Sequence, residues 1–141
     1  MTSKAWYQLC ILRDDVRSGK LTIDEFAADL NDACTKSSPA VYHDPGMFFD
    51  RTFATHRMKN LAANVLKRLN GDVGTPVMRL QVACGGGGKT HTLIVLLHLA
   101  EHGQALVDDS TVKAFLTFAG LTTAPQARVA LYLACAFRRN S

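Results

Sequence analysis

Apolar residues recur at spacings of three and four along much of the chain, which is the pattern of helices that bury one face. The longest unbroken repeat covers residues 56–69, and Gly71 follows it at a position where glycine commonly ends a helix. A second repeat starts after Thr22 and Glu25, whose spacing is that of a capping box, and runs to about Cys34. Both stretches are therefore predicted to be helices packed on a core.

Weaker patterns predict two more helices in the first half of the chain. Apolar and charged residues follow a helical spacing over 5–16, and Gly19 is expected to end that segment. Pro45 suits the first position of a short helix made of the apolar and aromatic residues that follow it. With these elements, residues 1–74 are predicted to form a mostly helical N-terminal region.

The second half has a different pattern, in which short apolar runs flank a glycine-rich loop. Residues 76–83 are predicted to form a strand, and 91–102, which is apolar almost all round, a buried helix that Gly103 ends. Residues 127–137 are a second candidate strand, rich in the side chains of a buried parallel sheet. This order predicts the α/β class: residues 75–141 are expected to start a partial P-loop NTPase domain.

The loop between the first predicted strand and the helix carries the motif A-x-x-x-x-G-K-T, the Walker A spacing with alanine in place of the leading glycine. Its phosphate-binding candidates are Gly85, Gly86, Gly87, Gly88, Lys89 and Thr90. Glycines allow successive backbone amides to turn toward an anion, and the positive end of the following helix points at the same place. Lys89 would bridge the β- and γ-phosphates of ATP, and the Thr90 hydroxyl would help to hold Mg²⁺.

Several short motifs resemble the amino-terminal part of large bacterial AAA-like P-loop ATPases, a family long labelled a domain of unknown function. The motifs are Asp44-Pro45, Phe48-Phe49, Arg51-Thr52-Phe53, Arg79-Leu80-Gln81 and the run from Gly86 to Leu93. The resemblance covers most of the chain and implies ATP binding through the residues named above, in proteins that occur in restriction and phage-defence gene clusters. For the intact ATPase it also implies a nucleic-acid partner and assembly into oligomers.

The chain departs from this family in three respects. It is many times shorter than family members, its glycine run is one residue longer, and Cys84 stands where relatives tend to have an aromatic residue. A cysteine beside a helix N-terminus is also a candidate nucleophile, but no histidine and aspartate can be assigned to Cys84 from the sequence. A loop-filling role is therefore preferred for Cys84.

A P-loop ATPase also needs a Walker B acid at the end of an apolar strand. Residues 105–109 mimic that motif, but they follow the P-loop helix almost directly, and Asp108 to Ser110 is predicted instead to cap a helix over 111–119. The chain is therefore expected to be the front part of a larger ATPase, which binds nucleotide and hydrolyses little of it alone. No catalytic residue is assigned.

Two further functions stay open on the sequence. His98-Leu-Ala-Glu101-His102 matches H-x-x-E-H, the inverted zinc-protease motif, although no glutamate follows Glu101 to supply a third ligand. The segment 51–68 holds five basic residues and no acidic one. It is either a solvated helix face or the surface of a non-enzymatic module that binds nucleic acid or another partner.

Composition bounds these choices. The chain has 141 residues, of which 48% are apolar and 20% charged, the proportions of one folded domain. Sixteen basic and twelve acidic residues give a net charge of +4, which allows a nucleic-acid partner without requiring one. The four cysteines form no CxxC pair, which excludes a zinc ribbon and favours a reduced, cytoplasmic setting. No apolar stretch approaches the roughly 20 residues of a membrane-spanning helix, so a soluble protein is expected.

Overall fold

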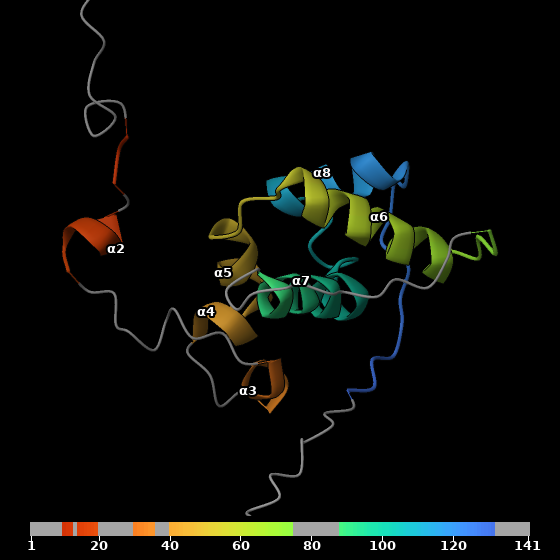
Figure 1. The fold of residues 1–141 in the computed structure, drawn as a ribbon, viewed down its shortest axis with the longest axis horizontal. Coiled ribbons are helices and arrows are strands. Elements are labelled where there is room, and N and C mark those ends of the chain that lie inside the picture. The colour runs from red at the N-terminus through yellow and green to blue at the C-terminus, as the bar shows by residue number, and fades with distance from the viewer. Residues whose placement is uncertain (1–9, 13, 20–29, 36–39, 75–87, 132–141) are drawn as a thin grey trace, which may run out of the picture.

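The computed structural model describes residues 10–12, 14–19, 30–35, 40–74 and 88–131 (Figure 1). Within these ranges every regular element is a helix. The helices are α2 (Asp14–Arg17), α3 (Leu30–Thr35), α4 (Ala40–His43), α5 (Pro45–Asp50), α6 (His56–Leu69), α7 (Lys89–His102) and α8 (Ser110–Ala119). The three longest, α6, α7 and α8, form the body of the fold.

Helices α6 and α8 pack against each other, α7 contacts α6, and α5 lies beside the start of α7 (Figure 1). The buried face of α6 includes part of the stripe that its apolar repeat predicts. Its buried residues are Leu61, Ala62, Ala63 and Leu66. From α8 the buried residues are Val112, Phe115, Leu116 and Ala119. All of these residues except Leu61 belong to one core cluster, together with residues from α3, α4, α5 and α7.

The short helix α5 supplies two of the three phenylalanine rings that are fully buried in this core. Phe48 is 1% exposed and Phe49 is fully buried. The two rings meet edge to face with centroids 5.5 Å apart, and Phe49 in turn lies 6.4 Å from the ring of Phe115 on α8. Edge-to-face pairs at these separations are favourable beyond the apolar area that they bury. Through these contacts α5 joins α7 to α8.

The predicted α/β class is wrong for the part of the chain that the structure describes, because that part contains helices and no strand. Residues 127–131, the described part of the predicted second strand, have no regular structure. The amide of Ala127 donates to the carbonyl of Ala100 at 3.2 Å, so this segment runs along α7 instead of joining a sheet. A short apolar run does not by itself distinguish a strand from an irregular segment that packs on a helix. The predicted strand at 76–83 lies outside the described residues.

The helical predictions fare better where a long repeat supported them. The helix predicted over 56–69 is confirmed, as are the short helix from Pro45 and the helices at 91–102 and 111–119, with small changes of boundary. Of the segment 5–16, residues 10–12 are irregular and helix begins at Asp14. The helix expected up to Cys34 is described only from Leu30. Helix α4 was not predicted, since four residues are too few to show a period.

Gly103 ends α7 as predicted, but for a different reason from the usual one. Its φ is −57°, an ordinary helical value, so no left-handed conformation demands glycine here. A Cβ at this position would collide with the carbonyl oxygen of Leu99 and approach the Cβ of Ala124 to 2.8 Å. Glycine is therefore favoured at 103 because a Cβ would meet both the last turn of α7 and the segment after α8.

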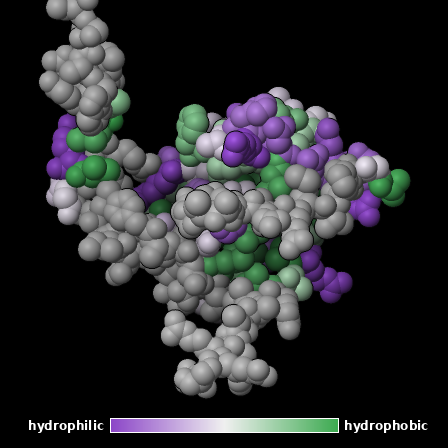
Figure 2. Space-filling view, viewed as in Figure 1, coloured by the Kyte–Doolittle hydropathy of each residue, from purple (hydrophilic) through white to green (hydrophobic). Residues whose placement is uncertain are grey.

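The segment 127–131 also borders an open apolar groove of about 340 Å³ between α3, α6 and α7. Leu69, Leu93, Val129 and Leu131 line it and are each about 40% exposed. Figure 2 shows apolar atoms gathered in the lower half of the molecule, where α7 runs. No helix in the described ranges has both the length and the apolar character needed to cross a bilayer.

Two phenylalanines in one short segment offer a matched test of the core. Replacing Phe49 with alanine should lower the free energy of unfolding by about 3–5 kcal/mol, because the ring is fully buried and its loss leaves a cavity. Replacing Phe53, which is 84% exposed, should change that free energy by roughly 0.5 kcal/mol or less. Urea unfolding followed by circular dichroism measures both. Equal losses in the two variants would contradict this core.

Candidate functional site

The start of α7 is the place where the predicted phosphate-binding residues enter the described structure. Gly88 is the N-cap residue and has φ of +71°, a left-handed conformation that glycine adopts without strain. Lys89, Thr90 and His91 follow as the first turn of the helix. Gly85, Gly86 and Gly87 lie outside the described residues. The structure thus brings Gly88, Lys89 and Thr90 together at one helix end.

The first turn of α7 lacks the side-chain cap that the starts of the neighbouring helices have. Asp44 caps α5, Thr55 caps α6 and Asp109 caps α8, each through a side-chain oxygen that accepts from amides of the first turn. Gly88 has no side chain and makes no such bond. The first amides of any helix have no partner within the helix, and those of Lys89, Thr90 and His91 receive none from the side chain of the N-cap residue.

Lys89, the candidate phosphate-binding lysine, forms no ion pair with a described residue. Lys89 and Thr90 are half-buried. In the described part of the chain, ion pairs join Arg17 to Asp14, His102 to Glu101 and Lys113 to Asp108, and Lys89 belongs to none of them. The Thr92 hydroxyl donates to the Gly88 carbonyl at 2.7 Å, which directs that carbonyl along the helix. Among the residues that the structure describes, no carboxylate pairs with the Lys89 ammonium group.

Two contacts join the start of α7 to α5 and to the residues that directly follow α5, and no pattern in the sequence predicts them. The Thr52 hydroxyl lies 3.1 Å from Nε2 of His91, although the two residues are 39 positions apart. The ring of Phe48 lies 4.7 Å from the His91 ring, measured between centroids. Burial lowers the pKa of His91, which favours the neutral imidazole. The motifs that carry the family resemblance contain all three residues, but no pattern in the sequence indicates that they meet.

His98, the first histidine of the zinc-protease pattern, is part of the core. His98 is 3% exposed, and its Nε2 lies 2.8 Å from the carbonyl oxygen of Tyr42. Because a carbonyl can only accept, Nε2 must carry the proton, which leaves Nδ1 as the unprotonated nitrogen. Nδ1 is buried without a hydrogen-bond partner, and burial lowers the pKa of His98. Nowhere in the described ranges do three potential metal ligands come together, so the zinc interpretation gains no support.

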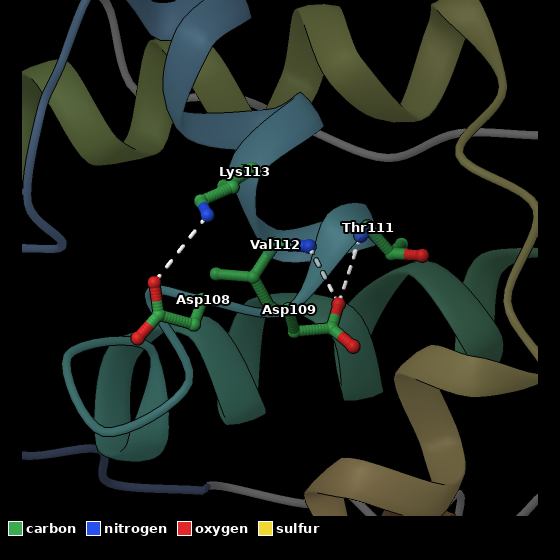
Figure 3. A network of polar contacts seen from close by, with 5 residues as sticks. All are labelled: Asp108, Asp109, Thr111, Val112 and Lys113. Atoms are coloured by element: carbon green, nitrogen blue, oxygen red, sulfur yellow. Dashed lines mark hydrogen bonds and ion pairs between the residues drawn. The ribbon is translucent and has the colours of Figure 1, made fainter.

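The segment that mimics a Walker B motif forms a turn and a helix cap (Figure 3). Asp109 Oδ1 accepts from the amides of Thr111 and Val112 at 2.8 and 2.9 Å, which confirms the predicted cap. Asp108 is almost fully exposed and pairs with Lys113 at 3.3 Å. Neither carboxylate follows a strand in this structure, so neither has the setting of a Walker B acid.

Two of the five basic residues in 51–68 lie at the end of a helix, which accounts for their positive charge there. Lys67 and Arg68 lie in the last turn of α6, where positive charge interacts favourably with the helix dipole. Arg68 also donates from Nη1 to the carbonyl of Val73 at 2.9 Å. Cys84, the other alternative, lies outside the described residues. A nucleic-acid surface on α6 stays a prediction.

The family comparison covers most of the chain. The sequence model of the DUF499 N-terminal domain matches residues 6–125, and the chain therefore belongs to the DUF499 family. Searches of curated proteins and of solved structures gave no match. The matched range includes α5, the glycine run and all of α7 and α8.

The two neighbouring aspartates allow the cap to be tested. Replacing Asp109 with alanine should cost about 1 kcal/mol of unfolding free energy, because two amides of α8 lose their acceptor. Replacing Asp108 should have little effect, since its ion pair is exposed. Asp109→Asn should keep most of the stability, as asparagine also caps helices. Urea unfolding of the three variants tests this, and equal effects of Asp108→Ala and Asp109→Ala would contradict the cap.

The buried His98 should make stability depend on pH. Its pKa is lowered in the folded state, so below about pH 6.5 the unfolded chain binds the proton more readily and the free energy of unfolding falls as pH falls. One histidine contributes a slope of at most about 1.4 kcal/mol per pH unit. His98→Gln, whose amide can still donate to the Tyr42 carbonyl, should show a smaller loss between pH 7.5 and 5.5. The exposed His56, replaced by glutamine, serves as the control, and an unchanged slope in His98→Gln would refute the assignment.

Proposed function

We propose that the chain binds the phosphates of ATP, together with Mg²⁺, at the start of α7. The observation that carries this proposal is the start of α7. Gly88, the N-cap residue, has positive φ and no side-chain cap, and Lys89 and Thr90 are the first two residues of the helix. The residues proposed to surround the phosphates are Gly85, Gly86, Gly87, Gly88, Lys89 and Thr90. The last three of these are adjacent at the helix end.

Three physical effects act in the same direction at this helix end. The amides of the first turn lack acceptors within the helix, and an anion supplies one. The helix dipole places partial positive charge at the same point. Lys89 adds a full positive charge that no described carboxylate neutralises. A phosphate group, with several acceptor oxygens and negative charge, uses all three.

The side chains of Lys89 and Thr90 have different roles in this proposal. Lys89 would contact the β- and γ-phosphates as a cation, and the Thr90 hydroxyl would be an oxygen ligand of Mg²⁺, which prefers such ligands. Both residues are half-buried. The donor set of amides, ammonium and hydroxyl fits a magnesium–nucleotide complex.

Binding is proposed for these residues, and hydrolysis is not. The acids nearest to a Walker B pattern, Asp108 and Asp109, are used in an exposed ion pair and in the cap of α8. The resemblance to AAA-like ATPases of restriction and phage-defence gene clusters supports the further proposal that nucleotide binding here serves such an ATPase. In that setting, nucleic acid and further copies of the ATPase are the proposed partners.

Calorimetric titration with Mg²⁺-ATP tests the proposal. Lys89→Ala should weaken binding by roughly tenfold to a hundredfold, because a hydrogen bond to a charged group is lost. Lys67→Ala, which removes an exposed lysine of α6, should bind as the wild type does. A parallel assay should detect little phosphate release.

Two results would contradict the proposal. A folded wild-type chain that does not bind Mg²⁺-ATP excludes a working phosphate site. Equal affinity in wild type and Lys89→Ala places the nucleotide elsewhere. Salt-sensitive binding of DNA that is unaffected by ATP would favour the basic segment 51–68 as the functional surface.

A further inference from the structure

Thr52 makes two hydrogen bonds from one buried hydroxyl. Its Oγ1 lies 2.7 Å from the carbonyl oxygen of Phe48 and 3.1 Å from Nε2 of His91, and the residue is 6% exposed. A hydroxyl has one hydrogen, and a carbonyl can only accept, so Thr52 donates to Phe48. Thr52 therefore accepts from Nε2–H of His91, which fixes the orientation of the imidazole ring.

The ring of Phe48 makes a second contact between this part of the chain and α7. Its centroid lies 4.7 Å from that of His91 and 5.1 Å from that of His98, seven residues further along α7. Phe48 is 1% exposed, so it cannot move without opening the core. The segment from Phe48 to Thr52 is thus fixed against two successive parts of α7.

His91 connects this segment to the helix end. It is the third residue of α7, directly after Lys89 and Thr90, and its own amide belongs to the uncapped first turn. A helix that is apolar almost all round can pack in more than one rotation about its axis, because apolar contacts have little directionality. A buried hydrogen bond is directional, so it selects one rotation.

We propose that Thr52 is a positioning residue, which holds the first turn of α7 through His91 in the orientation that phosphate binding requires. This inference rests on the proposed function. Neither the Thr52 side chain nor the His91 imidazole contacts the nucleotide in this scheme. Their contribution is to set the direction of the first-turn amides and of the side chains at positions 89 and 90.

The test compares Thr52→Val, which keeps the shape of the side chain and removes the hydroxyl, with Thr52→Ser, which keeps the hydroxyl. Thr52→Val loses the bond to the Phe48 carbonyl and the bond from His91, and only the second involves α7. Hydrogen exchange without nucleotide should show faster exchange of the amides of residues 92–95 in this variant, by roughly threefold to tenfold for the loss of the bond from His91. Amides in α6 and α8 should keep their rates. The dissociation constant for Mg²⁺-ATP should rise by a similar factor in Thr52→Val. In Thr52→Ser both the exchange rates and the dissociation constant should stay near the wild-type values.

A second variant covers the case in which Thr52→Val does not fold. His91→Phe keeps a ring against Phe48 but has no group to donate to Thr52, and it should give the same local exchange and the same weaker binding. His56→Phe, a substitution of an exposed histidine on α6, is the matched control and should leave both measurements unchanged.

The outcomes separate the two proposals. Unchanged exchange at 92–95 together with unchanged affinity in Thr52→Val and His91→Phe overturns the positioning role while the phosphate site stands. Faster exchange throughout α6, α7 and α8 also overturns it, because Thr52 would then act on the whole core. A wild-type chain that does not bind Mg²⁺-ATP overturns the proposed function and the positioning role with it.

Discussion

The side chain of Phe48 lies between two histidines of α7, and the arrangement of the described core depends on this placement. Phe48 fixes the position of α5 along α7, and Phe49, the next residue, extends the same aromatic contact to Phe115 of α8. Both rings are almost completely buried. Two adjacent side chains thus connect helices that are far apart in the sequence, and the interior around them is close-packed, as protein interiors are.

Helix α7 shows how a few polar contacts determine the position of a mostly apolar element. Its apolar residues supply the free energy of burial, but they distinguish poorly between alternative rotations of the helix. The bond from His91 to Thr52 and the bond from His98 to the Tyr42 carbonyl each require one rotation. His98 is buried and His91 is half-buried, and burial lowers the pKa of each, which favours the neutral imidazole. The apolar contacts stabilise the helix, and the two histidines orient it.

The sequence predicted the elements whose pattern extends over several turns. The repeat over 56–69 predicted α6 with its observed bounds, and the spacing of Asp108 to Ser110 predicted the cap of α8. The apolar run at 127–137 was interpreted as a strand because composition alone does not show what such a run packs against. In the structure its first residues lie along α7. The predicted α/β class was therefore wrong for the described residues, because it depended on interpreting short apolar runs as strands.

The candidate site was predictable to the same limited degree. The spacing after the glycines makes Lys89 and Thr90 candidates for phosphate binding, which stays a prediction, and the helix that they begin is confirmed. Thr52 could not be identified, because it is separated from His91 by 39 positions and a hydrogen bond between distant residues leaves no periodic signal. Sequence motifs and periodic patterns indicate interactions between residues that are close along the chain. Contacts such as that between Thr52 and His91 depend on the tertiary fold.

The absence of a side-chain cap on α7 has a thermodynamic consequence. An acceptor that binds the first-turn amides completes the helix end, so ligand occupancy and folding become linked equilibria. At a free ligand concentration one hundred times the dissociation constant, this linkage amounts to about 2.7 kcal/mol in favour of the folded chain. Aspartate at the starts of α5 and α8 provides the same completion permanently and within the chain. If α7 binds phosphate as proposed, a molecule from solution supplies that contribution, and the stability of this helix end then reports the supply of that molecule.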